Sequence, residues 1–255
     1  MSRSRYFENN LKPLEIHHDS LKATLLTLRS AIATALRIIV TQHDSPDVDA
    51  REGPYIGESG IALMYIRLAI QAKATGLSQD IVDRLPAYAR SHLSIDQKYG
   101  RPKPGHLAPL DSWVGHAVLE VIYELHYPSP THHTSIWTAA ADGVRSAILT
   151  ALEDEGLGGD EVLYGRAGLL WAMLVLHTCV AQGLGAPDRR RELAIIINET
   201  QIGQVVGMII QTGIHGAKAF KSEYHEEYRT LFGKHKSQDE IPLMWPWHGK
   251  FCLGA

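Results

Sequence analysis

The chain has 255 residues, of which 45% are hydrophobic and 21% are charged, and these values are typical of a soluble globular protein. They exclude disordered, collagen-like and coiled-coil chains. The net charge of −3 provides no basic field, so we expect no nucleic-acid partner. Two cysteines are too few for a disulfide scaffold, and residues 1–15 resemble no secretory signal. We therefore expect a cytoplasmic protein, with peripheral membrane association left open.

Two uncharged stretches, residues 167–187 and 200–217, are long enough to be tested as membrane spans. Glycines and polar side chains interrupt both stretches. A helix that is apolar on all sides is also typical of the interior of a layered protein. We therefore expect buried helices and no transmembrane segment.

Apolar side chains recur at helical spacing almost throughout the chain. The pattern predicts a helix from Ser20 to about residue 41, another from about 61 to 76, and a third from Ser78 that Pro86 interrupts or restarts. Further helices are predicted at 114–125, capped by Asp111 or Ser112, and at 136–152, 161–182 and 188–212. No segment of useful length has the alternation of a strand. The predicted fold is all-α and forms one domain.

A short glycine element recurs at three of these helix starts. Aligned on the letters, it has glycines at 57 and 60, at 165 and 168, and at 115, with Val118 in place of the second glycine. Glycine allows neighbouring backbones to approach closely. The strongly apolar and more amphipathic helices alternate, which favours an inner and an outer layer.

Three longer segments resemble the eukaryotic LanC-like proteins, relatives of the bacterial lanthionine cyclases. They are residues 53–69 (GPYIGESGIALMYIRLA), 160–176 (DEVLYGRAGLLWAMLVL) and 243–255 (LMWPWHGKFCLGA). The opening RYFEN, residues 5–9, is similar to the start of those proteins, so the resemblance covers the whole chain. The run LYGRAG at residues 163–168 is the most specific match.

The resemblance implies a toroid of paired helices, with an inner ring inside an outer ring around a central cavity. Complete members hold one zinc ion through two cysteines and a histidine. The zinc activates a thiolate, which adds to dehydroalanine or dehydrobutyrine and forms a thioether. The bacterial enzymes cyclise lantibiotic precursors in this way, whereas the eukaryotic relatives bind glutathione and add it to dehydroamino acids in damaged proteins.

This chain departs from the family where it ends, because the zinc-ligand motifs of the family lie beyond the equivalent of Ala255. We therefore expect an incomplete (α/α) toroid of about four of the seven helix pairs, forming one C-terminally truncated domain over residues 1–255. We expect no zinc or other cofactor in this chain and no thioether formation, so its status as an enzyme stays open. Glutathione or a dehydroamino-acid-containing peptide is the candidate partner.

The candidate site residues lie in two of the matching segments. Glu161 is a candidate general acid or base, with helix capping as the alternative. Arg166 is a candidate for binding a substrate carboxylate, with an exposed ion pair as the alternative, and Tyr164 is a candidate for substrate binding. The resemblance adds His248 as a candidate catalytic residue and Trp247 as a substrate-binding residue, with aromatic packing as the alternative. No metal ligands are expected among them.

Two further hypotheses stay open. The chain could bind glutathione or a protein without catalysis. By analogy of fold, it could also be a glycoside-processing enzyme, which needs a pair of carboxylates, and Glu58, Asp111 and Glu161 are candidates. Apart from that hypothesis, Glu58 and His116, at equivalent places in the repeated element, are weaker candidates for site residues. An interrupted ring exposes apolar inner helices such as residues 169–176, so we expect oligomerisation or poor solubility.

Overall fold

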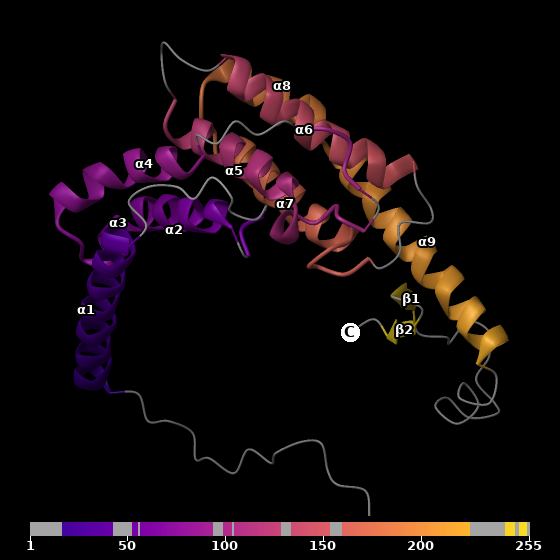
Figure 1. The fold of residues 1–255 in the computed structure, drawn as a ribbon, viewed down its shortest axis with the longest axis horizontal. Helices are drawn as coiled ribbons and strands as arrows, with labels where there is room; N and C mark the ends of the chain where they lie inside the picture. The colour runs from indigo at the N-terminus through magenta and orange to yellow at the C-terminus, as the bar shows by residue number, and fades with distance from the viewer. Residues whose placement is uncertain are drawn as a thin grey trace, which may run out of the picture.

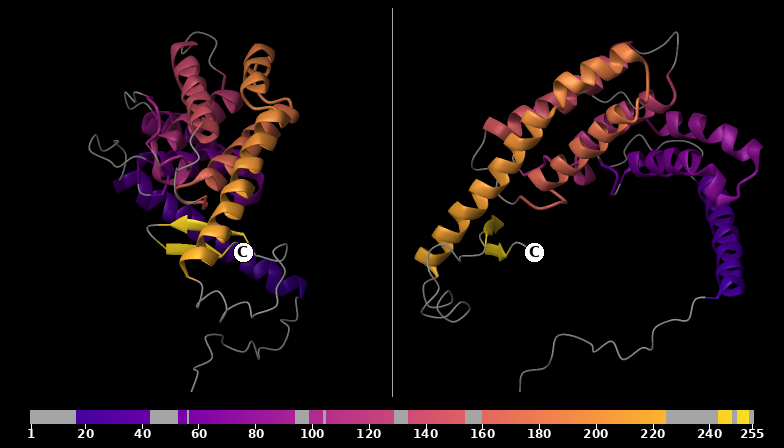
Figure 2. Two further views of the ribbon diagram at one scale, coloured as in Figure 1. Left: turned by 90° about the vertical axis from the view of Figure 1, so that its right-hand side faces the viewer. Right: turned by 180° about the vertical axis from the view of Figure 1, so that it is seen from behind.

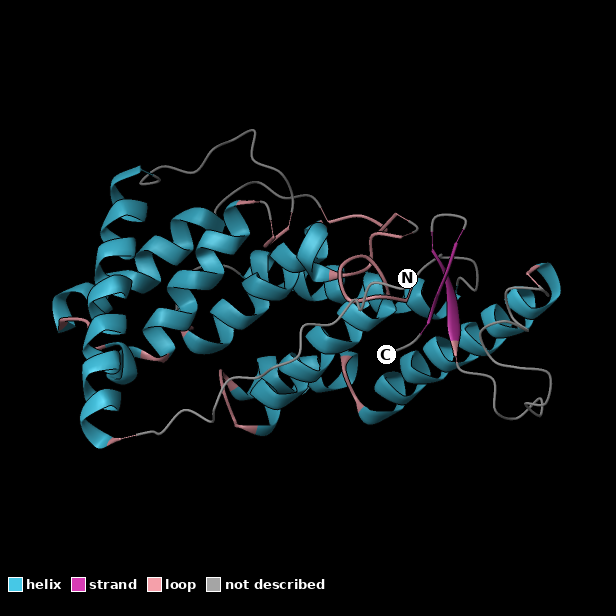
Figure 3. Cartoon of the chain, turned by 90° about the horizontal axis from the view of Figure 1, so that it is seen from below, coloured by secondary structure: helices cyan, strands magenta, loops and turns pink. Residues whose placement is uncertain are grey.

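The fold is that of a computed structural model, which describes residues 17–42, 53–55, 57–93, 99–103, 105–128, 134–153, 160–224, 243–247 and 250–253. Thr134, Pro246, Trp247 and residues 250–253 are described by their backbone alone. These parts of the chain are mainly helical, as predicted (Figure 3). They also include one short β-hairpin, which was not predicted.

The elements follow one another as a series of helices that ends in the hairpin (Figure 1). The helices are α1 (His18–Gln42), α2 (Glu58–Ile70), α3 (Ala72–Thr75), α4 (Gln79–Leu93), α5 (Trp113–His126), α6 (Thr134–Glu153), α7 (Arg166–Ala181), α8 (Pro187–Ile196) and α9 (Glu199–Glu223). A 3-10 turn, η1 (Pro109–Asp111), precedes α5. Strands β1 (Met244–Trp247) and β2 (Lys250–Leu253) pair antiparallel.

The helices form two layers. Helices α2, α5 and α7 are neighbours in what we call the inner layer, and they pack on α4, α6 and α9 respectively. Helix α8 packs on α6 and α7. The described elements trace an open arch, with α1 at one end and α9 with the hairpin at the other (Figures 1 and 2).

Helix α5 lies at the centre of the fold because it contributes to both large hydrophobic clusters. Val114, Val118 and Leu125 of α5 belong to the cluster that joins α5 to α6, α7, α8 and α9. Leu119 and Tyr123 belong to the cluster shared with α2 and α4. Burial against both sides makes α5 the helix that joins the two halves of the arch.

Two predictions about where a helix is continuous are wrong. Pro86 does not interrupt α4, because Leu85, Ala89 and Leu93 are buried in the cluster shared with α2, and this packing outweighs the local preference of proline. The predicted helix over 188–212 is two helices, α8 and α9. Asn198 separates them with a capping box, in which its side chain accepts the backbone N–H groups of Thr200 and Gln201.

The hairpin escaped prediction because its strands have only four residues each and β1 contains a proline. Trp245 docks it on α9: the indole Nε1 donates to the carbonyl oxygen of Ile209 at 2.9 Å, and the ring lies over Gly213. Met244 is buried against Ala217 and Phe220. Trp245 is therefore a packing residue.

Two described segments are long and apolar enough to cross a membrane, judged by length and composition alone. They are α1 and the run from Pro187 to Glu223, which comprises the separate helices α8 and α9. Analysis of the sequence missed α1, whose Leu21, Leu26 and Leu28 are more than half exposed. The prediction that no segment crosses a membrane is not tested by this finding.

The inner helices share one structural feature at their N-terminal ends. The third residue of each is a glycine, Gly60, Gly115 or Gly168, and a Cβ atom there would overlap a backbone carbonyl oxygen. The carbonyls belong to Pro54, Pro109 and Val162, each six residues before its glycine. The alignment of Gly115 with Gly57 was therefore wrong by three residues, and Ser112 occupies the N-cap position that glycine occupies elsewhere.

Hydrogen bonds join the loops before these helices into a series. The N–H of Tyr55, before α2, donates to the carbonyl oxygen of Leu110, before α5, at 3.0 Å. The N–H groups of Leu107 and Ala108 donate in turn to the carbonyl oxygen of Tyr164, before α7, at 2.9 and 3.2 Å. The three inner helices therefore start at one edge of their layer.

We expect Gly115→Ala to lower the free energy of unfolding by about 1–3 kcal/mol, because the added methyl group must displace backbone. The control is Gly207→Ala in the interior of α9, where a Cβ meets nothing within 4 Å. That change should raise the free energy of unfolding by about 0.5–1 kcal/mol. Urea denaturation measures both, and equal effects of the two substitutions would contradict the close approach.

Candidate functional site

Glu161 lies in the turn that leads into α7, and its carboxylate binds the backbone. Oε2 accepts the N–H of Leu163 at 2.8 Å, and Oε1 accepts the N–H of Tyr164 at 2.6 Å. Both bonds satisfy donors ahead of the helix, and α7 begins at Arg166 and not at Glu161 as predicted. Glu161 therefore binds the backbone of its own turn and does not cap α7, whose N-cap residue is Gly165. Its role as a general acid or base stays a prediction.

Arg166 is buried, with 1% of its surface exposed, so the alternative of an exposed ion pair is wrong. Its Nε donates to the carbonyl oxygen of Ala151 at the end of α6, at 2.8 Å. One terminal nitrogen donates to both carboxylate oxygens of Asp160, at 3.0 and 3.2 Å. Burial raises the pKa of Asp160, and the Arg166 guanidinium and the Thr212 hydroxyl oppose this rise. The guanidinium thus joins α7 to the end of the outer helix before it.

Tyr164 contributes mainly its backbone to the arrangement. Its carbonyl oxygen accepts the two N–H groups from the loop before α5. Its half-buried ring meets the imidazole of His106 edge-on, with the ring centroids 6.3 Å apart. Substrate binding by Tyr164 stays a prediction.

The remaining two candidates are described only in part. His248 lies outside the described residues, and Trp247 is placed by its backbone alone, opposite Lys250 in the hairpin. The structure thus places Glu161 and Tyr164 in the turn before α7 and Arg166 at the first residue of that helix. It places Trp247 on a separate element that packs on α9.

The carboxylates considered for glycoside chemistry have separate partners. The Glu58 carboxylate is hydrogen-bonded to Nδ1 of His92, and both residues are buried. Asp111 lies 3.8 Å from Nδ1 of His106. Glu161 binds the backbone of its own turn. Each of the three carboxylates therefore lies against a different group of the described chain.

A buried charged cluster between the layers was missed in the sequence. Glu120 and Glu124 of α5 are at most 2% exposed, and Arg90 of α4 pairs with both of them. Arg189 of α8 pairs with Glu124, and within the described chain Oε2 of Glu120 is the buried side-chain atom without a hydrogen bond. Burial, and then the charge of Glu120, raises the pKa of Tyr99. The cluster could have been suspected from the two glutamates, which are four residues apart in a mainly apolar helix and therefore share one face of it.

His116, a weaker candidate, lies beside this cluster. Its Nε2 is 3.6 Å from Oε1 of Glu120, one helical turn further along α5. His116 is buried on the side of α5 that carries the two glutamates, so it belongs to the charged cluster between the layers.

Among the described residues, no group of three or more His, Cys, Asp and Glu side chains is arranged to hold a metal ion. Cys179 of α7 is buried, and burial raises the pKa of its thiol. Cys179 is therefore a residue of the core. The side chain of Cys252 lies outside the described part.

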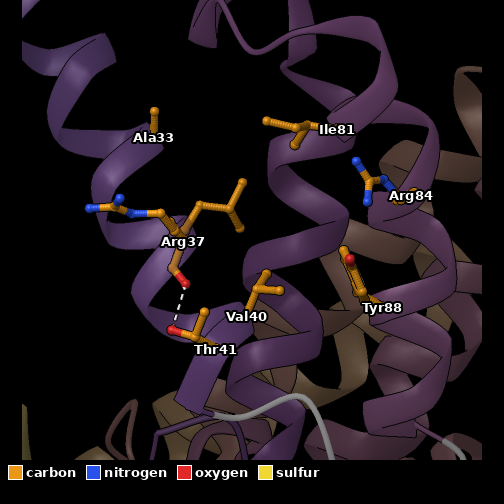
Figure 4. Close-up of a pocket in the computed structure, with 8 residues that line it drawn as sticks. Ala33, Arg37, Val40, Thr41, Ile81, Arg84 and Tyr88 are labelled. Atoms are coloured by element: carbon orange, nitrogen blue, oxygen red, sulfur yellow. Dashed lines mark hydrogen bonds between the residues drawn. The ribbon is translucent and has the colours of Figure 1, made fainter.

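Several hollows lie on the described surface. One, which we call the inner groove, lies between α2, α5 and α7 and has a volume of about 350 Å³. Another, of about 190 Å³, lies between α1 and α4 (Figure 4). Arg37 and Val40 line it from α1, and Ile81, Arg84 and Tyr88 line it from α4.

No family model matches the chain. The resemblance to LanC-like proteins therefore depends on the motifs of the sequence.

We expect Arg166→Met to lower the free energy of unfolding by about 3–5 kcal/mol, because the change leaves the Asp160 carboxylate buried without its guanidinium. The matched control is Arg101→Met, which removes an arginine that is 65% exposed from its pair with Glu153. That change should cost no more than about 1 kcal/mol. Denaturant titration measures both, and restoration of stability by Asp160→Asn in the Arg166→Met protein would support the pairing.

Proposed function

We propose that this chain is a LanC-like protein, related to the zinc-dependent enzymes that add thiols to dehydroalanine and dehydrobutyrine. In this proposal its helices form part of a toroid wall and bind a ligand without catalysing thioether formation. The candidate ligands are glutathione and peptides that contain dehydroamino acids. The composition of the chain supports a cytoplasmic location.

The repeated helix starts support the toroid. Three inner helices begin with the same glycine at their third residue, and their preceding loops are hydrogen-bonded in series. Each inner helix packs on an outer partner. Repetition of such a pair, with each loop bound to the next, is the construction that a curved double layer of helices requires.

The contacts that Glu161 and Arg166 make within the fold support the proposal that the chain binds a ligand but does not catalyse thioether formation. A general acid or base must be within hydrogen-bond reach of the reacting group, yet both oxygens of Glu161 accept backbone N–H groups. A substrate-binding guanidinium must reach the cavity, yet that of Arg166 is buried against Asp160 and Ala151. Both side chains stabilise the start of α7.

The test incubates the full chain with zinc, glutathione and a dehydroalanine-containing peptide and follows the adduct by mass spectrometry. We expect adduct formation at the rate of the protein-free control and less than one zinc per chain by metal analysis. Calorimetry with glutathione alone tests binding. Stoichiometric zinc with turnover would contradict the proposal, and no heat with millimolar glutathione would remove glutathione as the ligand.

A further inference from the structure

The inner groove runs along the length of the inner helices. Pro54 and Pro109 line it near the starts of α2 and α5, and Ile70 and His126 line it at their ends. A second hollow of about 370 Å³ adjoins it and shares Arg67, His126, Trp171 and Cys179 with it. These volumes are typical of small-molecule sites, which occupy about 300–1,000 Å³.

The walls of the groove are apolar. Ile66, Val118 and Leu119, all almost fully buried, line it together with partly exposed Leu63 and Val175. A helix face of this kind favours a hydrocarbon ligand, because burial of apolar surface is the main source of affinity there. Glutathione, with its charged and amide groups, matches these walls poorly.

The charge of the groove has one sign. Arg67 and His126 line both hollows, and no Asp or Glu is among the described residues that line them. The Arg67 guanidinium makes no hydrogen bond or ion pair with the described residues, and its position in the last turn of α2 favours a cation through the helix dipole. Burial, and then the charge of Arg67, lowers the pKa of His126, which favours the neutral imidazole and leaves Arg67 as the cation of the groove.

We propose that the inner groove binds a monoanionic amphipath of the fatty-acid class. The carboxylate lies between Arg67 and His126 at the ends of α2 and α5, and the hydrocarbon chain lies along Val118 and Leu119 toward the helix starts. Helix α2 has 13 residues and is therefore about 20 Å long, so the groove accommodates an extended chain. This site depends on the residues of the groove and not on the resemblance to LanC-like proteins.

The test is isothermal titration calorimetry of the full chain with decanoate, decan-1-ol and decyltrimethylammonium. We expect one decanoate per chain, weaker binding of the alcohol and the weakest binding of the ammonium compound. Arg67→Ala should weaken decanoate binding about tenfold or more, because it removes a charge-assisted hydrogen bond. Arg67→Lys should weaken it less. Arg37→Ala, which removes an exposed arginine from the groove between α1 and α4, should leave it unchanged.

A variant that fills the groove completes the test. Val175→Trp should abolish decanoate binding while the melting temperature without ligand stays close to that of the wild type, since Val175 is partly exposed. No heat with decanoate, equal affinity for the ammonium compound or an unchanged affinity of Arg67→Ala would each overturn the proposal. Light scattering that shows a stable dimer which Val175→Trp dissociates would also overturn it, because a second copy would then cover the groove.

Discussion

The whole arrangement of the inner layer depends on the contact between the third residue of each inner helix and the loop before it. At Gly115 a side chain would meet both the carbonyl oxygen of Pro109 and the ring of Pro54, which belongs to the neighbouring loop. At Gly168 it would meet the carbonyl oxygen of Val162 and the side chain of Ala108. The missing Cβ atom of each glycine thus has two consequences. Each loop can pack on its own helix, and adjacent loops come within hydrogen-bond distance of each other.

The buried charges complement this contact from the opposite side of the inner layer. On α5, Glu120 and Glu124 point to arginines of α4 and α8, whereas Val118, Leu119 and Ile122 line the inner groove. Residues three and four apart share a helix face, so the two sets form separate stripes. The charged stripe holds the layers together. The same division leaves the inner face of α5 apolar until His126 at its last residue.

The helical class and most helices could be predicted from the sequence, because apolar spacing is a local signal. The register of the repeated element could not be predicted. Gly57 and Gly115 are both glycines, but they do not occupy equivalent positions, and it is the contact with the carbonyl of Pro109 that makes Gly115 equivalent to Gly60. The burial of Arg166 depends on Ala151 and Asp160, and no local pattern predicts the contact with Ala151. The contacts of Glu161 are local, with neighbours two and three residues away, but they lie in the turn before α7 and not at the helix N-terminus where capping was expected.

The exposure of the helices at the ends of the arch, like the burial of α5 at its centre, depends on how many neighbouring helices cover each one. In a layered array of helix pairs each pair packs on its neighbours, so a terminal element is covered on one side only. Helix α1 illustrates this: Leu36 is its buried residue, and leucines of its first three turns face solvent. Its contacts include the groove with α4 and a hydrogen bond from Nε of Arg29 to the carbonyl oxygen of Ala74. Helix α5, covered on both sides, is nearly all buried, so burial along the chain reports the number of neighbours that each helix has and not its hydrophobicity alone.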